Sequence, residues 1–333
     1  MAYTTIDDPE KYYQSVTWTG NSDSTRNIVL PGDTDMQPDI VWADNISNTS
    51  DNRWSTSILG TSQHMIVNGP DAVDGSSTAL TAFNSDGFST GNEQTYNNNG
   101  NSHIAWCWKE DPIAGLDLVP TYEGNATART ISHNLGAVPH WMLIRNIDQN
   151  RNWVVYHHKN TSAPETDYLY LSSTEATADA NTIFNDTAPT SSVFTVGTDN
   201  GVNDNGQTHI AHLWTGIKGF SKFGSYTGNG NADGAFIFTG FQPQTVIIKI
   251  TSEAEDWQLF DQKLGGYNGG NLRIAPSANS GASSGDNRMD LVSNGFKLRD
   301  AGTNFNKASA TYVYMAWARS PFVNSNGVPC NSR

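Results

Sequence analysis

The chain has 333 residues, of which 36% are hydrophobic and only 16% are charged, and its formal net charge is −14. The acidic excess would repel the negatively charged backbone of a nucleic acid, which argues against nucleic-acid binding. The 35 asparagines and 30 glycines indicate many turns, while 10 tryptophans, 12 tyrosines and 13 phenylalanines can bury enough surface to exclude disorder.

The start of the chain and the cysteines carry few signals. Met1-Ala-Tyr-Thr-Thr-Ile lacks a basic region followed by an apolar run, and no stretch approaches 18 consecutive apolar residues. We therefore expect synthesis in a cytosol and no membrane segment. Cys107 lies in an aromatic run and Cys330 in a polar tail, so a disulfide between them is not expected.

Five landmarks recur in one order three times along the chain. The first is a Gly-Asn pair at Gly20, Gly124 and Gly228, each 104 residues after the one before. The others are a proline before an apolar run, a tryptophan, a turn ending in phenylalanine, and an aromatic strand: Pro38, Pro139 and Pro243; Trp54, Trp153 and Trp257; Phe88, Phe194 and Phe296; and residues 103–108, 209–214 and 312–317. A fixed period of this kind indicates repeated structural units.

Each unit is predicted to be a small antiparallel β domain, because β-branched and aromatic runs alternate with Asn-Gly and Asp-Gly turns. The sequence predicts an all-β fold of three tandem, homologous antiparallel β-sandwich or jelly-roll units. They span residues 1–115, 116–218 and 219–333, the third with a short C-terminal tail. The joints at 108–120 and 214–224 are short and partly apolar, so the units should pack as a rigid block.

Two short patterns resemble functional motifs, and for both a structural interpretation is favoured. Gly281-Ala-Ser283-Ser-Gly285 matches a nucleophile elbow, but no helical pattern follows it, so we expect a polar loop. Residues 199–206 place oxygen-bearing side chains at alternate positions, as calcium loops do. No carboxylate closes that stretch, so we expect a hairpin turn.

The eight histidines do not have the spacing of metal ligands. His209 and His212 should point to opposite faces of one strand, and the adjacent His157 and His158 should diverge. His103, His209 and Tyr312 occupy matching positions in the repeat, which favours a buried polar role. The remaining three, His64, His133 and His140, are expected to stand alone in polar surroundings.

Acidic clusters, aromatic residues in loops and glycosylation sequons are further candidates for functional sites. Asp7-Asp8, Glu110-Asp111 and the cluster Glu253, Glu255 and Asp256 could serve a glycosidase, but they lack counterparts in the other units, which favours solvated loop charge. Trp18, Tyr122 and Tyr226 are expected in the core, whereas Tyr96 and Tyr267 are better candidates for stacking on sugars. The sequons begin at Asn45, Asn48, Asn125, Asn160 and Asn185, a number that composition alone explains.

Longer strings of the repeat, at residues 37–42, 83–88, 103–109, 219–230 and 293–299, allow a comparison with a known family. They resemble a repeat family encoded among the structural genes of tailed marine bacteriophages, notably those of cyanobacteria and pelagic bacteria. The resemblance covers residues 12 to 322 and implies a virion part, such as a tail fibre, an appendage or a capsid decoration. The middle unit departs from the pattern at His212-Leu213, where the first unit has Trp106-Cys107.

We therefore expect a non-enzymatic structural protein of a bacteriophage virion, with no catalytic residues, no cofactor and no metal. Its expected partners are other virion proteins of the capsid or tail and further copies of itself in a homo-oligomer, rather than nucleic acid or a membrane. Two alternatives stay open. One is a lectin-like, receptor-binding adhesin for host-surface glycans, whose ligand-binding residues the sequence does not identify, and the other, less favoured, is a polysaccharide hydrolase.

Overall fold

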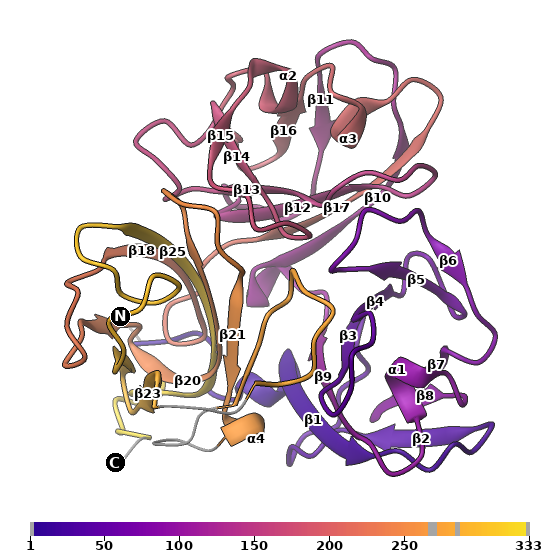
Figure 1. Cartoon of the computed structure of the whole chain (residues 1–333), viewed down its shortest axis with the longest axis vertical. Coiled ribbons are helices and arrows are strands. Elements are labelled where there is room, and N and C mark those ends of the chain that lie inside the picture. The colour runs from indigo at the N-terminus through magenta and orange to yellow at the C-terminus, as the bar shows by residue number, and fades with distance from the viewer. Residues whose placement is uncertain (1–2, 266–271, 284–286, 331–333) are drawn as a thin grey trace.

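The computed structural model describes residues 3–265, 272–283 and 287–330, and within them the protein is all-β (Figure 1). The strands of these described residues form six antiparallel sheets, three large and three small. The helices of the described residues are single turns: the 3-10 turns η1 (Pro9–Lys11) and η2 (Pro112–Ala114), and α1 (Gln94–Asn97), α2 (Asn181–Phe184), α3 (Asn200–Asn203) and α4 (Gln262–Gly265). None of the described helices is long and apolar enough to cross a membrane.

Each of three consecutive stretches holds one large and one small sheet, and we name them segment 1 (13–108), segment 2 (116–214) and segment 3 (221–321). In segment 1 the large sheet has the order β1-β9-β3-β4-β5-β6, and the small sheet has the order β2-β8-β7. The strands are β1 (Tyr13–Thr19), β2 (Arg26–Val29), β3 (Ile40–Asn45), β4 (Arg53–Thr56), β5 (Gln63–Ile66), β6 (Asp74–Gly75), β7 (Leu80–Asn84), β8 (Gly87–Thr90) and β9 (Ser102–Trp108).

Segment 2 has a large sheet of order β10-β17-β12-β13-β14-β15 and a small sheet that pairs β11 with β16. Its strands are β10 (Leu116–Glu123), β11 (Arg129–Ser132), β12 (Trp141–Asn146), β13 (Val154–His157), β14 (Asp167–Tyr170), β15 (Ala178–Asp179), β16 (Val193–Val196) and β17 (Thr208–Trp214). The predicted runs at 141–144 and 209–214 are confirmed as strands.

Segment 3 has a large sheet of order β18-β25-β20-β21-β22 and a small sheet of order β19-β24-β23. Its strands are β18 (Ser221–Thr227), β19 (Phe236–Phe238), β20 (Phe241–Ile250), β21 (Gln258–Asp261), β22 (Arg273–Ile274), β23 (Met289–Val292), β24 (Gly295–Leu298) and β25 (Thr311–Pro321). In all three segments the large sheet therefore begins with the first, last, third, fourth and fifth strands in that order. Residues of different segments are matched below by the residue of the last strand with which they pair. Ile40, Trp141 and Thr245, for example, pair with Trp108, Trp214 and Trp317 and therefore correspond to one another.

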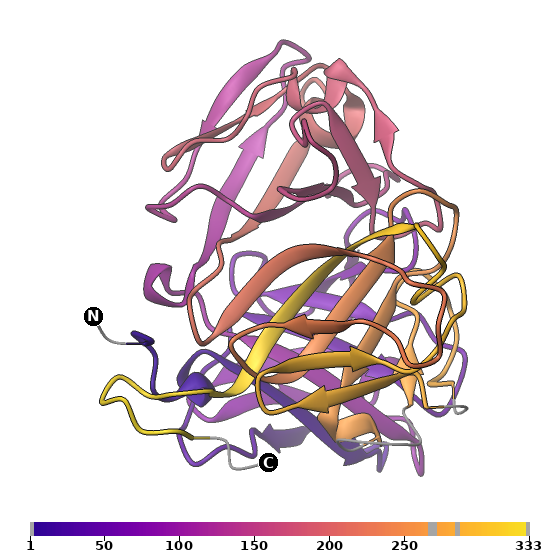
Figure 2. The same ribbon diagram turned by 90° about the vertical axis from the view of Figure 1, so that its left-hand side faces the viewer.

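The three large sheets surround one shared core of buried side chains. Figures 1 and 2 show the arrangement of these sheets from two sides. Side chains alternate along each strand. On β9, Ile104, Trp106 and Trp108 point into the shared core, whereas Ala105 and Cys107 face the small sheet of segment 1. Nine of the ten tryptophans lie in the shared core, with ring centroids such as those of Trp108 and Trp317 only 5.3 Å apart.

The same backbone hydrogen bond joins the segments in a ring. The amide of Val73 in segment 1 donates to Ile147 O in segment 2 at 2.9 Å. Thr177 of segment 2 donates to Thr251 O of segment 3 at 2.9 Å, and Ala282 of segment 3 donates to Ile46 O of segment 1 at 3.0 Å. The third bond joins segment 3 back to segment 1, so the three contacts close a ring.

The tryptophan landmark of the first segment needs correction. Matched by sheet register, Trp153 and Trp257 correspond to Asn52, and Trp54 lies two residues further along. The indoles of Trp153 and Trp257 donate to Ile66 O and Tyr170 O of the preceding segment, both at 2.8 Å. Asn52 makes the corresponding bond, since its amide donates to Pro276 O at 3.3 Å.

Candidate functional site

A buried asparagine holds the Gly-Asn turn of every segment. Asn97, Asn203 and Asn306 are all fully buried, and the Oδ1 of each accepts the amide N–H that follows the glycine of the turn. The N–H groups belong to Asn21, Asn125 and Asn229, at 2.9, 3.0 and 2.9 Å. These asparagines therefore stabilise a turn and are not exposed to a ligand.

The glycines of these turns are required by a close approach of the backbone. A Cβ atom at Gly20 would lie 2.0 Å from Asn98 O, and one at Gly124 or Gly228 would lie 2.1 Å from a carbonyl oxygen. Only glycine fits at such distances. The Gly-Asn pairs that mark the period are thus explained by packing.

A stacked aromatic pair supports each turn from the large sheet. Trp18 stacks on His103, Tyr122 on His209 and Tyr226 on Tyr312, with centroids 5.5, 5.3 and 4.7 Å apart. The first ring of each pair donates a hydrogen bond to a backbone oxygen of the turn region. Trp18, Tyr122 and Tyr226 are partly buried and pack against core clusters, so their expected core role is confirmed in part.

One position on the third strand of each large sheet carries a buried charge or carboxyl group. By register, Asp44, Arg145 and Lys249 occupy this position. Arg145 donates to Gly69 O at 3.1 Å and to Asp71 O, and Lys249 donates to Thr174 O at 2.9 Å, so both cations bind carbonyls of the preceding segment. Burial lowers the pKa of Arg145 to about 10 and that of Lys249 to about 8.

Asp44 replaces these cations at the junction of segments 1 and 3. Its side chain is 1% exposed, and its Oδ2 has no hydrogen-bond partner among the described residues. Burial raises its pKa to about 7, because a charged carboxylate is disfavoured away from water.

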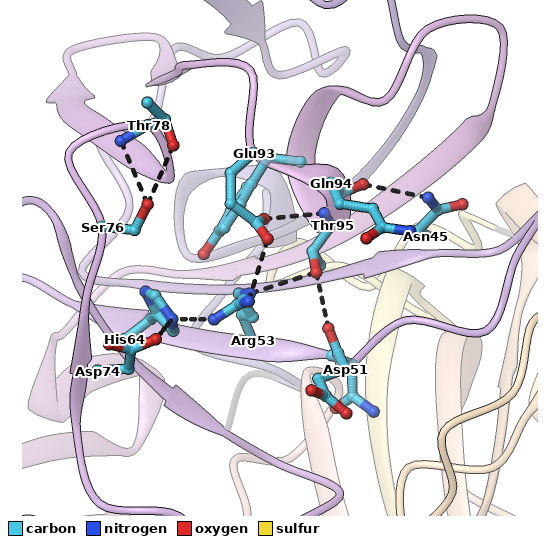
Figure 3. A network of polar contacts seen from close by, with 12 residues as sticks. Asn45, Asp51, Arg53, His64, Asp74, Ser76, Thr78, Glu93, Gln94 and Thr95 are labelled. Carbon is cyan, nitrogen blue, oxygen red and sulfur yellow. Dashed lines mark hydrogen bonds and ion pairs between the residues drawn. The ribbon is translucent and has the colours of Figure 1, made fainter.

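Segment 1 also contains an arginine-centred polar network (Figure 3). Arg53 pairs with Glu93 through Nη2 and Oε1 at 3.0 Å, and its Nε donates to Thr95 Oγ1 at 3.3 Å. Its Nη1 donates to His64 Nε2. Burial and the nearby Arg53 charge lower the pKa of His64 to about 4, so this histidine is neutral at pH 7 and accepts the bond.

The matching place in segment 2 is an open cleft of about 570 Å³. By register, Val154 replaces Arg53. Asp199 replaces Glu93, since each caps the single helical turn that ends in the buried asparagine, and each accepts the N–H two residues on. The cleft is lined by Pro70, Asn150, Arg151, Asn152, Val154, Tyr170, Thr182, Thr198, Asp199, Asn200 and Gly201. It is the strongest candidate for a ligand-binding site.

A second cleft, of about 340 Å³, lies where segments 1 and 3 meet, lined in part by Gln14, Gln244 and Lys263. Behind it is the buried carboxylate of Asp261, which accepts hydrogen bonds from five groups: Ser15 Oγ, Gln244 Nε2, Thr245 Oγ1, Trp106 Nε1 and Lys263 N. Burial raises its pKa and these donors oppose the rise. Because the donors come from both segments, this network fastens the first segment to the third.

The histidine predictions are partly confirmed. His209 and His212 do lie in different environments, the first at the turn and the second in the shared core. Burial lowers the pKa of His212 to about 3. The expected isolation of His64, His133 and His140 is wrong: His64 and His133 are buried, and the ring of His140 stacks on His158 at 4.0 Å.

Histidines 140, 157 and 158 gather where segments 2 and 3 meet. His157 and His158 do not diverge fully, since their ring centroids are 5.5 Å apart. Nε2 of His158 donates to Phe223 O at 3.0 Å, and Nδ1 of His140 accepts the amide of Gly216 at 2.9 Å. No group of three or more His, Cys, Asp or Glu side chains in the described part of the chain could hold a metal ion.

The other predicted motifs have structural roles. Residues 199–206 contain helix α3 rather than a hairpin turn, because Asp199 caps a helical turn that Asn203 closes. Ser283 forms an isolated bridge with Arg273, while Gly285 and Tyr267 lie outside the described residues. Tyr96 is wrong as a sugar platform, since it is fully buried and bonded to Ser55.

The acidic clusters serve local structure as well as solvation. Asp8 and Asp111 cap η1 and η2, Glu110 accepts the amide of Leu118, and Glu253 pairs with Lys307. Cys107 is buried and Cys330 exposed, and both are free thiols, as expected. Of the sequon asparagines, Asn45 and Asn160 are buried.

Sequence reasoning missed the positions that define the cleft and the junctions. Glu93 and Asp199 each lie four residues before a repeat-matched asparagine, Asn97 or Asn203, and that shared offset could have identified them. Asp44 and Arg145 left no comparable signal, because their equivalence depends on sheet register.

These features define a class: an all-β protein in which three large antiparallel sheets close around one tryptophan-rich core. The chain belongs to the family described as a domain of unknown function (DUF7483), whose model matches residues 8–321. No curated protein matches it. One solved structure, described as the crystal structure of the STIV MCP, is 11% identical and has a TM-score of 0.17, over 61% of this chain and 85% of the other. A likeness at that TM-score carries no argument about fold or function.

Proposed function

We propose that the protein is a non-enzymatic structural component of a bacteriophage virion, displayed on the particle surface as a capsid decoration or a tail appendage. The observation that carries the proposal is that polar residues recurring at matched positions build the scaffold. Asn97, Asn203 and Asn306 hold turns, and His103, His209 and Tyr312 support the same turns. A repeated catalytic or glycan site would instead leave its recurring polar groups exposed.

We propose further that segments 1 to 3 are tandem homologous repeats, with the boundaries predicted from the sequence, packed as a pseudo-trimer. Their shared strand order, the three turn asparagines and the cyclic hydrogen bonds support this proposal. Because the ring is closed, each repeat contacts both of the others. Such an arrangement suits a protein that must stay folded outside a cell. The ring also presents a similar strand arrangement three times, which suits contact with symmetric virion proteins or with further copies of this chain.

The proposal is tested by analysing particles purified from a host that produces phage carrying this gene. Mass spectrometry of extensively washed particles should find the protein at a fixed copy number relative to the major capsid protein, and labelled antibodies should mark the particle exterior. Absence of the protein from particles that still infect would contradict a virion role. Release of reducing ends from host polysaccharide would contradict the non-enzymatic part.

A further inference from the structure

We propose that the cleft beside Asp199 in segment 2 binds a guanidinium group, the head group of an arginine side chain from a partner protein. This inference goes beyond the structural role proposed above and does not depend on where the protein is located. It is derived from the way the other two segments fill the corresponding place.

Segment 1 fills the place with its own arginine. Glu93 Oε2 accepts the amide of Thr95 at 2.8 Å, and its Oε1 accepts Arg53 Nη2 at 3.0 Å. Thr95 Oγ1 accepts Arg53 Nε at 3.3 Å. The side chains of Arg53 and Glu93 are each 14% exposed, so this is a largely desolvated ion pair in which three guanidinium nitrogens have partners.

Segment 2 keeps the carboxylate and lacks the arginine. Asp199 Oδ1 accepts the amide of Gly201 at 2.7 Å, as Glu93 Oε2 does from Thr95, so the other oxygen of Asp199 corresponds to the one that binds Arg53. Val154 is too short to reach it. A Cβ atom at Gly201 would lie 3.0 Å from Asp199 Oδ1 and 3.2 Å from Val154 Cγ2, so a side chain there has little room. The result is a cleft of about 570 Å³ in place of an ion pair, within the size range of ligand pockets, roughly 300–1,000 Å³.

Segment 3 supplies an arginine from a different place in the fold, Arg288, which directly precedes β23. Gly302 holds the position of Glu93 and Asp199, because Asn306 N donates to Gly302 O as Asn97 N donates to Glu93 O. The carboxylate of Asp300 lies two residues earlier and accepts the amide of Gly302. Its Oδ2 pairs with Nη1 of Arg288. A carboxylate near this turn is therefore paired with a guanidinium in both segments, at the matched position in segment 1 and two residues earlier in segment 3.

The surroundings of the cleft suit a planar cation. The charged side chains that line the cleft are Asp199 and Arg151. Arg151 is already engaged elsewhere, because it lies 4.0 Å from Asp204, which is outside the lining, and donates to Asn150 O. Tyr170 adds an aromatic wall on which a guanidinium can stack. The chain as a whole carries a net charge of −14, which attracts a cationic partner.

The test uses the full chain and a small probe, N-acetyl-arginine methylamide, with the uncharged isostere N-acetyl-citrulline methylamide as its control. Titration followed by NMR and calorimetry should show one site for the arginine probe and at least about tenfold weaker binding of the citrulline probe, because charge-assisted hydrogen bonds are lost. Asp199→Asn keeps a residue that caps helices well, so it should fold normally while losing the site.

Two double variants exchange the cleft between segments. Val154→Arg with Gly201→Thr copies segment 1 into segment 2 and should abolish probe binding. Arg53→Val with Thr95→Gly copies segment 2 into segment 1 and should create a second site near Glu93. Equal binding of the two probes, binding that survives Asp199→Asn, or saturable binding of host glycans without binding of the arginine probe would each overturn the proposal.

Discussion

The junction of segments 1 and 2 and the junction of segments 3 and 1 share a backbone but differ in charge. Both contain the same amide-to-carbonyl bond, from Val73 to Ile147 in one and from Ala282 to Ile46 in the other. In the first, Arg145 donates to the carbonyls of Gly69 and Asp71, whereas in the other Asp44 holds a buried carboxyl group at the matched position. The sheet topology thus determines where the segments meet. Single side chains determine how strongly each junction is stabilised and how that stabilisation depends on pH.

The contact between a strand side chain and the preceding segment gives the largest expected effect. Trp153→Ala should lower the free energy of unfolding by about 3–5 kcal/mol, because a fully buried indole leaves a cavity and the hydrogen bond to Ile66 O is lost. Urea denaturation with an unchanged m-value measures it. A loss of under about 1 kcal/mol, the range usual for surface changes, would show that this contact does not hold the segments together.

The charge difference at the third junction predicts a dependence on pH. Burial raises the pKa of Asp44 to about 7 from an unfolded value of about 4, so the folded state binds the proton more tightly. The stabilisation is complete below about pH 4 and is lost as the pH rises towards 7 and above. Asp44→Asn should therefore be more stable than the natural chain at pH 8, by roughly 3–4 kcal/mol, and nearly equal to it at pH 4.

The control for this experiment is Asp86→Asn, a change at a carboxylate in the turn between β7 and β8. Unfolding of all three proteins is followed from pH 4 to pH 9. Parallel stability curves for the natural chain and Asp44→Asn would show that Asp44 does not titrate on folding.

A histidine in the shared core gives an effect of opposite sign. His212 corresponds by register to Trp106 and Met315, and burial lowers its pKa to about 3 from 6.5. Its contribution to stability is present above pH 6.5 and is lost as the pH falls. His212→Met, which copies segment 3, should reduce the loss of stability between pH 8 and pH 5 by about 2 kcal/mol. An unchanged slope over that range, measured by thermal or urea unfolding, would argue against a neutral buried His212.

The smallest expected change in stability tests whether Asn52 plays the role of Trp153 and Trp257 at its junction. Asn52→Ala removes the bond to Pro276 O and the bond that Asn52 Oδ1 accepts from Trp42 Nε1. The change should cost about 1–2 kcal/mol, less than the tryptophan because little apolar area is lost. Asn48, an exposed neighbour, provides the control as Asn48→Ala. Equal stability of the two variants would mean that Asn52 does not fasten segment 1 to segment 3.

The local structure was predictable and the register was not. Aromatic and β-branched runs predicted β12, β17 and β25, because side chains of this kind suit a pleated, half-buried surface. Trp54 was matched with Trp153 because both are tryptophans, yet the strand pairing shifts the match to Asn52. A register shift of two leaves the side-chain alternation unchanged, so the sequence pattern does not reveal it.

The candidate site was beyond prediction for a related reason. Arg53 and Glu93 lie 40 residues apart, and only the fold brings them together. The cleft in segment 2 exists because Val154 takes the place of Arg53, a difference visible only after the strands are aligned by their hydrogen bonds.

The central claim is that three segments close into one ring through the same junction used three times. Amide hydrogen exchange at Val73, Thr177 and Ala282 tests it directly, because each amide donates the matched bond of one junction. Comparable protection is expected at all three amides, and it should be lost together when the protein unfolds. Rapid, unprotected exchange at Ala282 while Val73 and Thr177 stay protected would contradict it, since segments 3 and 1 would then not be joined.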